Sequence, residues 1–194
     1  MNFQKKLLLT ATFILTTGIA GMVPYAGMWA ENRAALASPQ PVVVSAPIVP
    51  AKPDTVMGKP VHLSVPSLGI ELAVADGAHN VQTGEWTLSK TMAHYALPTT
   101  QPNNQTGNTL IYGHNRNEVF TKLLNVQPGA KAIVTTDNGY RFTYTYTSTE
   151  AVDPTNLDIF TYEGAPRLTL QTCSGAWYQN RQFFYFEYTS YDKV

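Results

Sequence analysis

The stretch Leu168–Cys173, with the sequence LTLQTC, alternates apolar and polar residues and ends in the only cysteine of the chain. Such alternation is typical of a half-buried β-strand, so we expect a thiol at the end of a strand. Arg181 opens the next stretch, RQFFYFEY, whose aromatic residues predict a second strand. If these two strands pair as antiparallel neighbours, Arg181 returns to a place beside Cys173.

A third strand predicted at Thr109–Tyr112 ends in Gly113 and His114. The glycine lets another backbone or a ligand approach closely, and a histidine at a strand end can give and take protons near neutral pH. The other histidines are expected within a strand, in a loop and on a short helical turn, respectively His62, His79 and His94. Their spacing forms no local metal motif and a single cysteine excludes a multi-thiolate zinc site, so we expect no metal and no cofactor.

The remaining patterns predict mostly strands. Alternating stretches predict strands at 61–65, 70–74, 130–135, 140–147 and 182–188, and Asp137-Asn138-Gly139 predicts a hairpin turn between the third and fourth of these. In 140–147 the residues Phe142, Tyr144 and Tyr146 fall on one face. A helix capped by Asn117 and ending near residues 128–129, and a helical turn at 88–95, are also expected. The predicted fold class is mainly β, a closed barrel of about eight strands with short helices.

The N-terminal region has a different composition. Lys5 and Lys6 precede Leu7–Ala30, which carries no charge and is long enough to span a bilayer. We therefore predict a cytoplasmic tip and transmembrane signal-anchor at 1–30, with the rest of the chain outside the membrane. Residues 31–56 form a proline-rich linker, and 57–194 form the folded domain. The alternative is a secreted protein, cleaved near Ala37 by signal peptidase.

Charge and cysteine count narrow the function. The formal net charge is zero, with 13 basic and 13 acidic residues, which gives no electrostatic support for binding nucleic acid. Outside the cytoplasm disulfides are permitted, yet one cysteine cannot form an internal bridge. Two interpretations of Cys173 remain from these facts alone: a small buried apolar residue, or a reactive thiol whose thiolate a nearby cation stabilises.

Several motifs in order resemble those of the sortases, the membrane-anchored cysteine transpeptidases of chiefly Gram-positive bacteria. The Thr-Leu-x-Thr-Cys strand of that family is present at 169–173, and an arginine follows at Arg181. The Gly-His context after a Gly-Asn-Thr strand is present at 107–114, and the stretches 60–70, 84–86 and 120–123 are also similar. The resemblance covers roughly 57–190. It departs at Tyr112, where small residues are frequent, and at 115–117, which replaces a commoner acidic or apolar continuation.

The resemblance implies a sortase-type barrel that cleaves a sorting signal of the Leu-Pro-x-Thr-Gly type. It implies Cys173 as the nucleophile, His114 as the acid and base, and Arg181 as the group that holds the oxyanion or the peptide. Thr172 and the segment 150–166 are expected to help line the groove. The implied partners are sorting-signal peptides of surface proteins and an amine acceptor, such as a peptidoglycan precursor or a pilin-type lysine. Two alternatives remain: an exported cysteine protease that only hydrolyses, and a surface-binding β-domain without activity.

Overall fold

The computed structural model describes residues 54–80, 82, 85–177 and 179–194. The expected signal-anchor at 1–30, the cleavage site near Ala37 and nearly all of the linker at 31–56 lie outside the described residues. Within the described ranges no helix is both long and apolar enough to cross a membrane.

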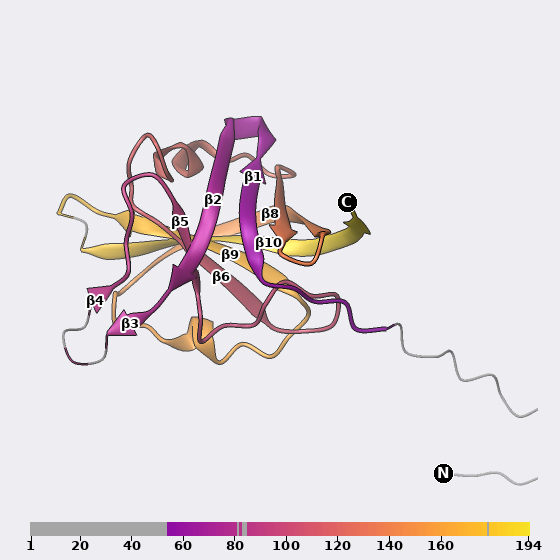
Figure 1. The fold of residues 1–194 in the computed structure, drawn as a ribbon. Helices are drawn as coiled ribbons and strands as arrows, with labels where there is room; N and C mark the ends of the chain where they lie inside the picture. The colour runs from indigo at the N-terminus through magenta and orange to yellow at the C-terminus, as the bar shows by residue number, and fades with distance from the viewer. Residues whose placement is uncertain (1–53, 81, 83–84, 178) are drawn as a thin grey trace, which may run out of the picture. The chain divides into compact units, whose positions relative to one another are not determined.

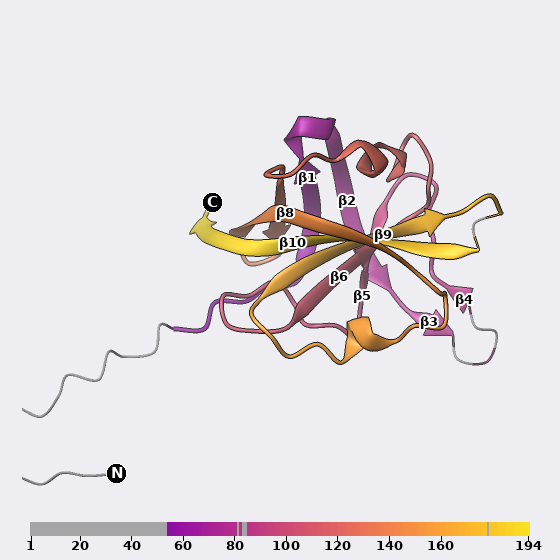
Figure 2. The same cartoon turned by 180° about the vertical axis from the view of Figure 1, so that it is seen from behind.

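Eight strands of the described chain close into a barrel in the order β1-β2-β5-β6-β9-β10-β8-β7 (Figures 1 and 2). The pairs β2–β5 and β6–β9 are parallel, and the other neighbouring pairs are antiparallel. This confirms the predicted mainly β, closed-barrel fold. The barrel strands are β1 Pro60–Val65, β2 Ile70–Gly77, β5 Ala93–Ala96, β6 Asn108–Tyr112, β7 Lys131–Thr136, β8 Tyr140–Val152, β9 Arg167–Ser174 and β10 Asn180–Lys193.

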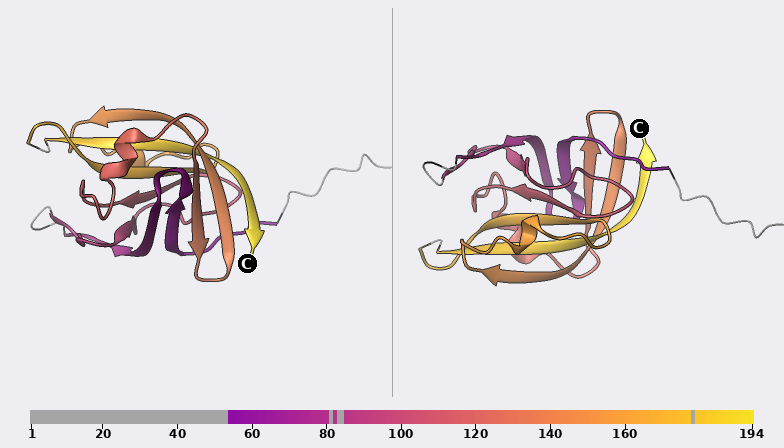
Figure 3. Two further views of the ribbon diagram at one scale, coloured as in Figure 1. Left: turned by 90° about the horizontal axis from the view of Figure 1, so that it is seen from above. Right: turned by 90° about the horizontal axis from the view of Figure 1, so that it is seen from below.

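Small elements connect the barrel strands. A two-stranded sheet pairs β3 (His79–Asn80) with β4 (Glu85–Trp86), and three short 3₁₀ helices are η1 (Pro66–Leu68), η2 (Thr121–Asn125) and η3 (Asp158–Phe160). The views along the vertical axis show that the β3–β4 hairpin and the β9–β10 loop project at one end, whereas the C-terminus lies at the other (Figure 3). The residues around Cys173 therefore lie at the end of the barrel opposite the C-terminus.

The β7–β8 hairpin is confirmed. Arg141 pairs with Thr135 across it, and Gly139 adopts a φ of 81°, which favours glycine in the turn. Phe142, Tyr144 and Tyr146 are all buried on the inner face, as their spacing predicts. The strand itself is longer than expected and continues to Val152.

Two helix predictions were wrong. The segment after Asn117 forms tight turns and then the 3₁₀ helix η2, whose N-cap is Phe120 without any side-chain cap. The expected helical turn at 88–95 does not form: residues 88–92 are irregular, and 93–95 belong to β5, whose four residues are all buried. A short apolar run that is buried on both faces has no period that separates strand from helix. His94 therefore lies on a strand, and His79 lies on β3 rather than in a loop.

Apolar side chains form two clusters on opposite faces of the strands around Cys173. The barrel interior holds the larger cluster, which includes Leu168, Leu170, Phe184 and Phe186. The smaller cluster lies on the outer face and consists of Ala96, Leu110, Tyr112, Ile159 and Phe183. Because side chains alternate along a strand, Cys173 shares the outer face with Phe183 and not the interior face with Leu170.

Candidate active site

Strand pairing places Arg181 beside Cys173. The two residues are partners in the antiparallel register of β9 and β10, so their side chains leave the same face of the sheet. Both side chains are partly exposed, and the thiol is free. The structure thus makes Cys173 and Arg181 cross-strand neighbours, as the sequence predicts for two consecutive strands.

His114 lies beside β9 as well, on the β6 side, opposite the side where β10 places Arg181. In the parallel pair of β6 and β9, Tyr112 is the partner of Gln171, and the next N–H, of Gly113, donates to the Gln171 carbonyl at 3.0 Å. His114 follows directly and is partly exposed. Because β9 lies between β6 and β10, Cys173 lies on the strand between β6, which ends two residues before His114, and β10, which carries Arg181.

Thr172 has a different environment from the one expected. Its side chain is 1% exposed, and its hydroxyl donates to the Gly113 carbonyl at 3.0 Å. Because successive side chains of a strand point to opposite faces, the Thr172 side chain lies on the face opposite the one that carries the Cys173 thiol. This corrects the expectation that Thr172 lines the groove: it joins the end of β6 to β9.

Sequence reasoning did not find the contact of Asn115 with the site. Its Nδ2 donates to the Cys173 carbonyl at 3.0 Å, and its Oδ1 accepts from the Thr121 hydroxyl at 2.8 Å. The only signal in the sequence was the departure from the family pattern directly after His114. That departure could not reveal the hydrogen bond from Asn115 to Cys173, because this bond depends on where β6 ends relative to β9.

A pocket of about 220 Å³ lies farther along the outer face, between β8, β10 and the β8–β9 segment. Phe183 and Tyr185 form part of its wall and lie on the same face as Arg181, two and four residues farther along β10. At roughly 3.3 Å per residue, this pocket lies within reach of an extended peptide whose reactive carbonyl is at Cys173. The expectation that the segment 150–166 contributes to a groove agrees with the lining, which includes Glu150, Asn156, Asp158, Ile159 and Tyr162.

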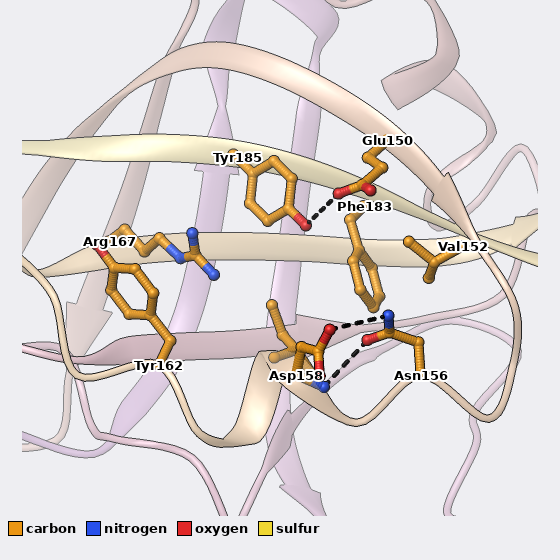
Figure 4. Close-up of a pocket in the computed structure, with 9 residues that line it drawn as sticks. Glu150, Val152, Asn156, Asp158, Tyr162, Arg167, Phe183 and Tyr185 are labelled. Carbon is orange, nitrogen blue, oxygen red and sulfur yellow. Dashed lines mark hydrogen bonds between the residues drawn. The ribbon is translucent and has the colours of Figure 1, made fainter.

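One end of this pocket is formed by Arg167, whose guanidinium lies 3.6 Å from the ring centroid of Tyr162 and 4.8 Å from that of Tyr185 (Figure 4). Its Nε donates to Asn108 Oδ1 at 3.1 Å. The Tyr185 hydroxyl donates to Glu150 Oε2 at 3.1 Å. The pKa of Tyr185 is raised to about 12, mainly by burial and secondly by the Glu150 carboxylate. The phenol therefore remains a neutral donor at neutral pH.

His62 and His94 have partners other than Cys173. His94 is buried on β5, where its ring stacks on Tyr112 with centroids 5.7 Å apart, and His62 lies on β1 near Glu71. Among the described residues there is no group of three or more His, Cys, Asp or Glu side chains that could hold a metal ion.

Fold and geometry together define a class of protein: a closed β-barrel with a free cysteine at a strand end, a histidine just past the end of one neighbouring strand and an arginine on the other. Comparison with protein families identifies it further. The model described as "Sortase domain" matches residues 63–186, well over half of the chain. The chain belongs to the sortase family. This chain is a cysteine transpeptidase. Sortases in general act on sorting signals and amine acceptors and are typically membrane-anchored.

Solved structures agree on the fold. Sortase E1 from Streptomyces coelicolor, with a tripeptide in its active site, is 20% identical, with a TM-score of 0.57 over 71% of this chain and 91% of that one. Sortase A from Listeria monocytogenes is 24% identical, with a TM-score of 0.53 over 73% and 92%. Sortase C2 of Group B Streptococcus pilus island 1 is 22% identical, with a TM-score of 0.56 over 66% and 73%. These three structures belong to different sortase subgroups. Among curated protein sequences, none matches the chain.

Proposed function

We propose that Cys173, His114 and Arg181 form the catalytic centre and transfer the acyl part of a Leu-Pro-x-Thr-Gly-like sorting signal to an amine. The observation that supports this proposal is the order of three neighbouring strands: Cys173 lies on β9, between β6, which leads to His114, and β10, which carries Arg181. Each group has the chemistry that one part of acyl transfer needs.

The reaction has two steps, acylation of Cys173 and transfer of the acyl group to the amine. The Cys173 thiolate attacks the threonine carbonyl, and the tetrahedral intermediate collapses when His114 protonates the departing glycine amine, which leaves a thioester on Cys173. His114 then removes a proton from the incoming amine, which attacks the thioester and releases the Cys173 thiolate. Arg181 donates to the oxyanion in both steps, because its charge is permanent and its N–H groups form a fixed fork.

The pocket on the outer face is the proposed binding site for the residues before the scissile bond. Phe183 and Ile159 provide apolar wall, and Arg167 is fixed between two tyrosine rings at one end. An extended peptide running from Cys173 along β9 and β10 places its upstream side chains over this wall. The tripeptide in the active site of the Streptomyces enzyme supports a peptide as substrate.

We further propose that residues 1–30 anchor the enzyme as a single-pass protein in the cytoplasmic membrane, with residues 57–194 on the extracellular side. The acceptor amine then belongs to a peptidoglycan precursor or to a lysine of another surface protein. The alternative, release after cleavage near Ala37, is tested by whether the full-length protein in cells fractionates with membranes and retains its N-terminus.

The function is tested with the full-length chain, a Leu-Pro-x-Thr-Gly peptide and excess oligoglycine. We expect mass spectrometry to show a peptide joined to oligoglycine, and we expect Cys173→Ala to abolish that product. Hydrolysed peptide as the only product at saturating amine would identify a protease instead. Unchanged peptide, with Cys173 reactive to thiol reagents only after denaturation, would indicate a binding domain.

A further inference from the structure

Asn115 continues the ladder between β6 and β9 past the point where the backbone of β6 leaves the sheet. In this parallel pair the N–H of Gly113 donates to the Gln171 carbonyl. Backbone bonds of a parallel ladder recur every two residues, so a longer β6 would use the N–H of residue 115 to reach the carbonyl of residue 173. The side-chain amide of Asn115 makes that contact, at 3.0 Å.

The Thr172 hydroxyl makes a second side-chain contact of the same kind. A longer ladder would bring the N–H of residue 173 to the Gly113 carbonyl, and the Thr172 hydroxyl donates to that carbonyl at 3.0 Å. Two side chains therefore replace two backbone donors on either side of His114. This leaves the backbone of His114 free to turn, and its carbonyl accepts from the N–H groups of Arg116 at 2.9 Å and Phe120 at 3.2 Å.

The Cys173 carbonyl, which can only accept, fixes the orientation of the Asn115 amide. Thr121 donates its hydroxyl to Oδ1 at 2.8 Å, and the carbonyl of Cys173 accepts from Nδ2. With the amide reversed, Oδ1 would face a carbonyl oxygen, and two acceptors cannot bond to each other. Thr121 opens η2, so the contact links three segments: the turn after His114, the end of β9 and the start of η2.

We propose that Asn115 is a positioning residue that holds His114 at its working distance from the Cys173 thiol, with the Thr121 hydroxyl holding its amide in place. The proposal rests on the proposed function, since it concerns the same histidine and thiol. Asn115 adjoins one of these residues in sequence and binds the backbone of the other. A displacement of about 1 Å at a reacting group can cost as much as 100-fold in rate, so this contact bears on the rate and not on peptide affinity.

The test compares neutral and charged variants of the full-length chain, with each rate expressed per reactive Cys173 thiol. We expect Asn115→Ala and Asn115→Asp to lower kcat about ten- to 100-fold, with the KM for the peptide within about twofold. Thr121→Val should lower kcat in the same direction by a smaller factor, and Thr121→Ser, which keeps the hydroxyl, should restore it. Asn117→Asp makes the same charge change two residues away on an exposed side chain and should leave kcat unchanged.

A second readout does not depend on transpeptidation. The rate of Cys173 alkylation by iodoacetamide is measured against pH, and we expect Asn115→Asp to shift this profile to higher pH, because an anion near the thiol disfavours thiolate. Asn117→Asp should not shift it. The proposal is overturned if the Asn115 variants keep the wild-type kcat per thiol and lose only melting temperature, or if only their KM changes. If the wild-type enzyme transfers nothing, the proposed function fails, and an alkylation profile unaltered in Asn115→Asp would overturn the positioning role separately.

Discussion

At the scale of single residues, the proposed site depends on the different chemistry of three side chains. A thiol reacts as thiolate, and a fixed positive charge nearby favours that form. Arg181 is the register partner of Cys173, so the charge comes from a rigid strand and not from a loop. An arginine also provides several N–H donors in one plane, which a lysine cannot.

This difference predicts the effect of Arg181→Lys. The substitution keeps the charge and removes the fork, so we expect kcat to fall about 100- to 1,000-fold, the range found when an oxyanion donor is removed. Arg141→Lys is the matched control, because Arg141 binds Asp192 on the exposed part of β8 and β10, and it should keep the wild-type kcat. Steady-state transfer kinetics measure both, and a wild-type kcat for Arg181→Lys would show that charge alone suffices.

At the scale of elements, the end of β6 decides where His114 lies. Gly113 is buried, and a Cβ added there would come within 2.7 Å of Val119 Cγ1 and 3.2 Å of Phe120 Cδ2. The turn before η2 therefore packs directly on the backbone of Gly113. The glycine is needed for this close approach and not for an unusual φ, since it is not among the glycines with positive φ.

Gly113→Ala should therefore push residues 119–120 away and lower the free energy of unfolding by about 1–3 kcal/mol, the usual cost of overpacking. The double variant Gly113→Ala/Val119→Ala should lose less stability than the sum of its two single variants, because the second change removes the atom that clashes. Denaturant unfolding of all four proteins measures this coupling. Strict additivity would contradict the packing described here.

Not every element could be predicted from the sequence. The period of two in β8 is visible because one face is buried and the other is not, as Phe142 and Thr143 show. β5 has no such contrast, since Ala93–Ala96 is buried throughout. In the site, the pairing of Cys173 with Arg181 follows from two strands joined by a short loop, whereas the bond from Asn115 depends on the length of β6. One sequence pattern indicated that Phe183 and Tyr185 are not simply exposed. Residues 183–186 are all aromatic, and a strand that is apolar on both faces has other parts of the protein packed against both faces.

At the scale of the whole molecule, burial of tyrosine rings links stability to pH. Burial is the largest cause that raises the pKa of six tyrosines above the ordinary value of 10. These are Tyr95, Tyr112, Tyr144, Tyr146, Tyr185 and Tyr188. The folded state therefore holds these protons at a pH where the unfolded chain has released them.

Unfolding then releases protons above about pH 10, so rising pH favours the unfolded state. We expect the free energy of unfolding to be insensitive to these groups below about pH 9 and to fall steadily from pH 10 to 12. Denaturant titrations across this range, with tyrosinate absorbance followed in parallel, measure it. Tyr185→Phe should make the fall shallower. Tyrosines that all ionise near pH 10 in a domain that stays folded would contradict this account.

The most direct measurement of the central claim is the mass of the enzyme during turnover. The full-length chain is mixed with a Leu-Pro-x-Thr-Gly peptide in the absence of amine, quenched in acid, and analysed intact and after digestion. We predict an adduct with the mass of the acyl part of the peptide, located on Cys173, released by hydroxylamine and absent from Cys173→Ala. Cleavage of the peptide with no adduct on Cys173, or with an adduct on another residue, would contradict the assignment of Cys173 as the nucleophile.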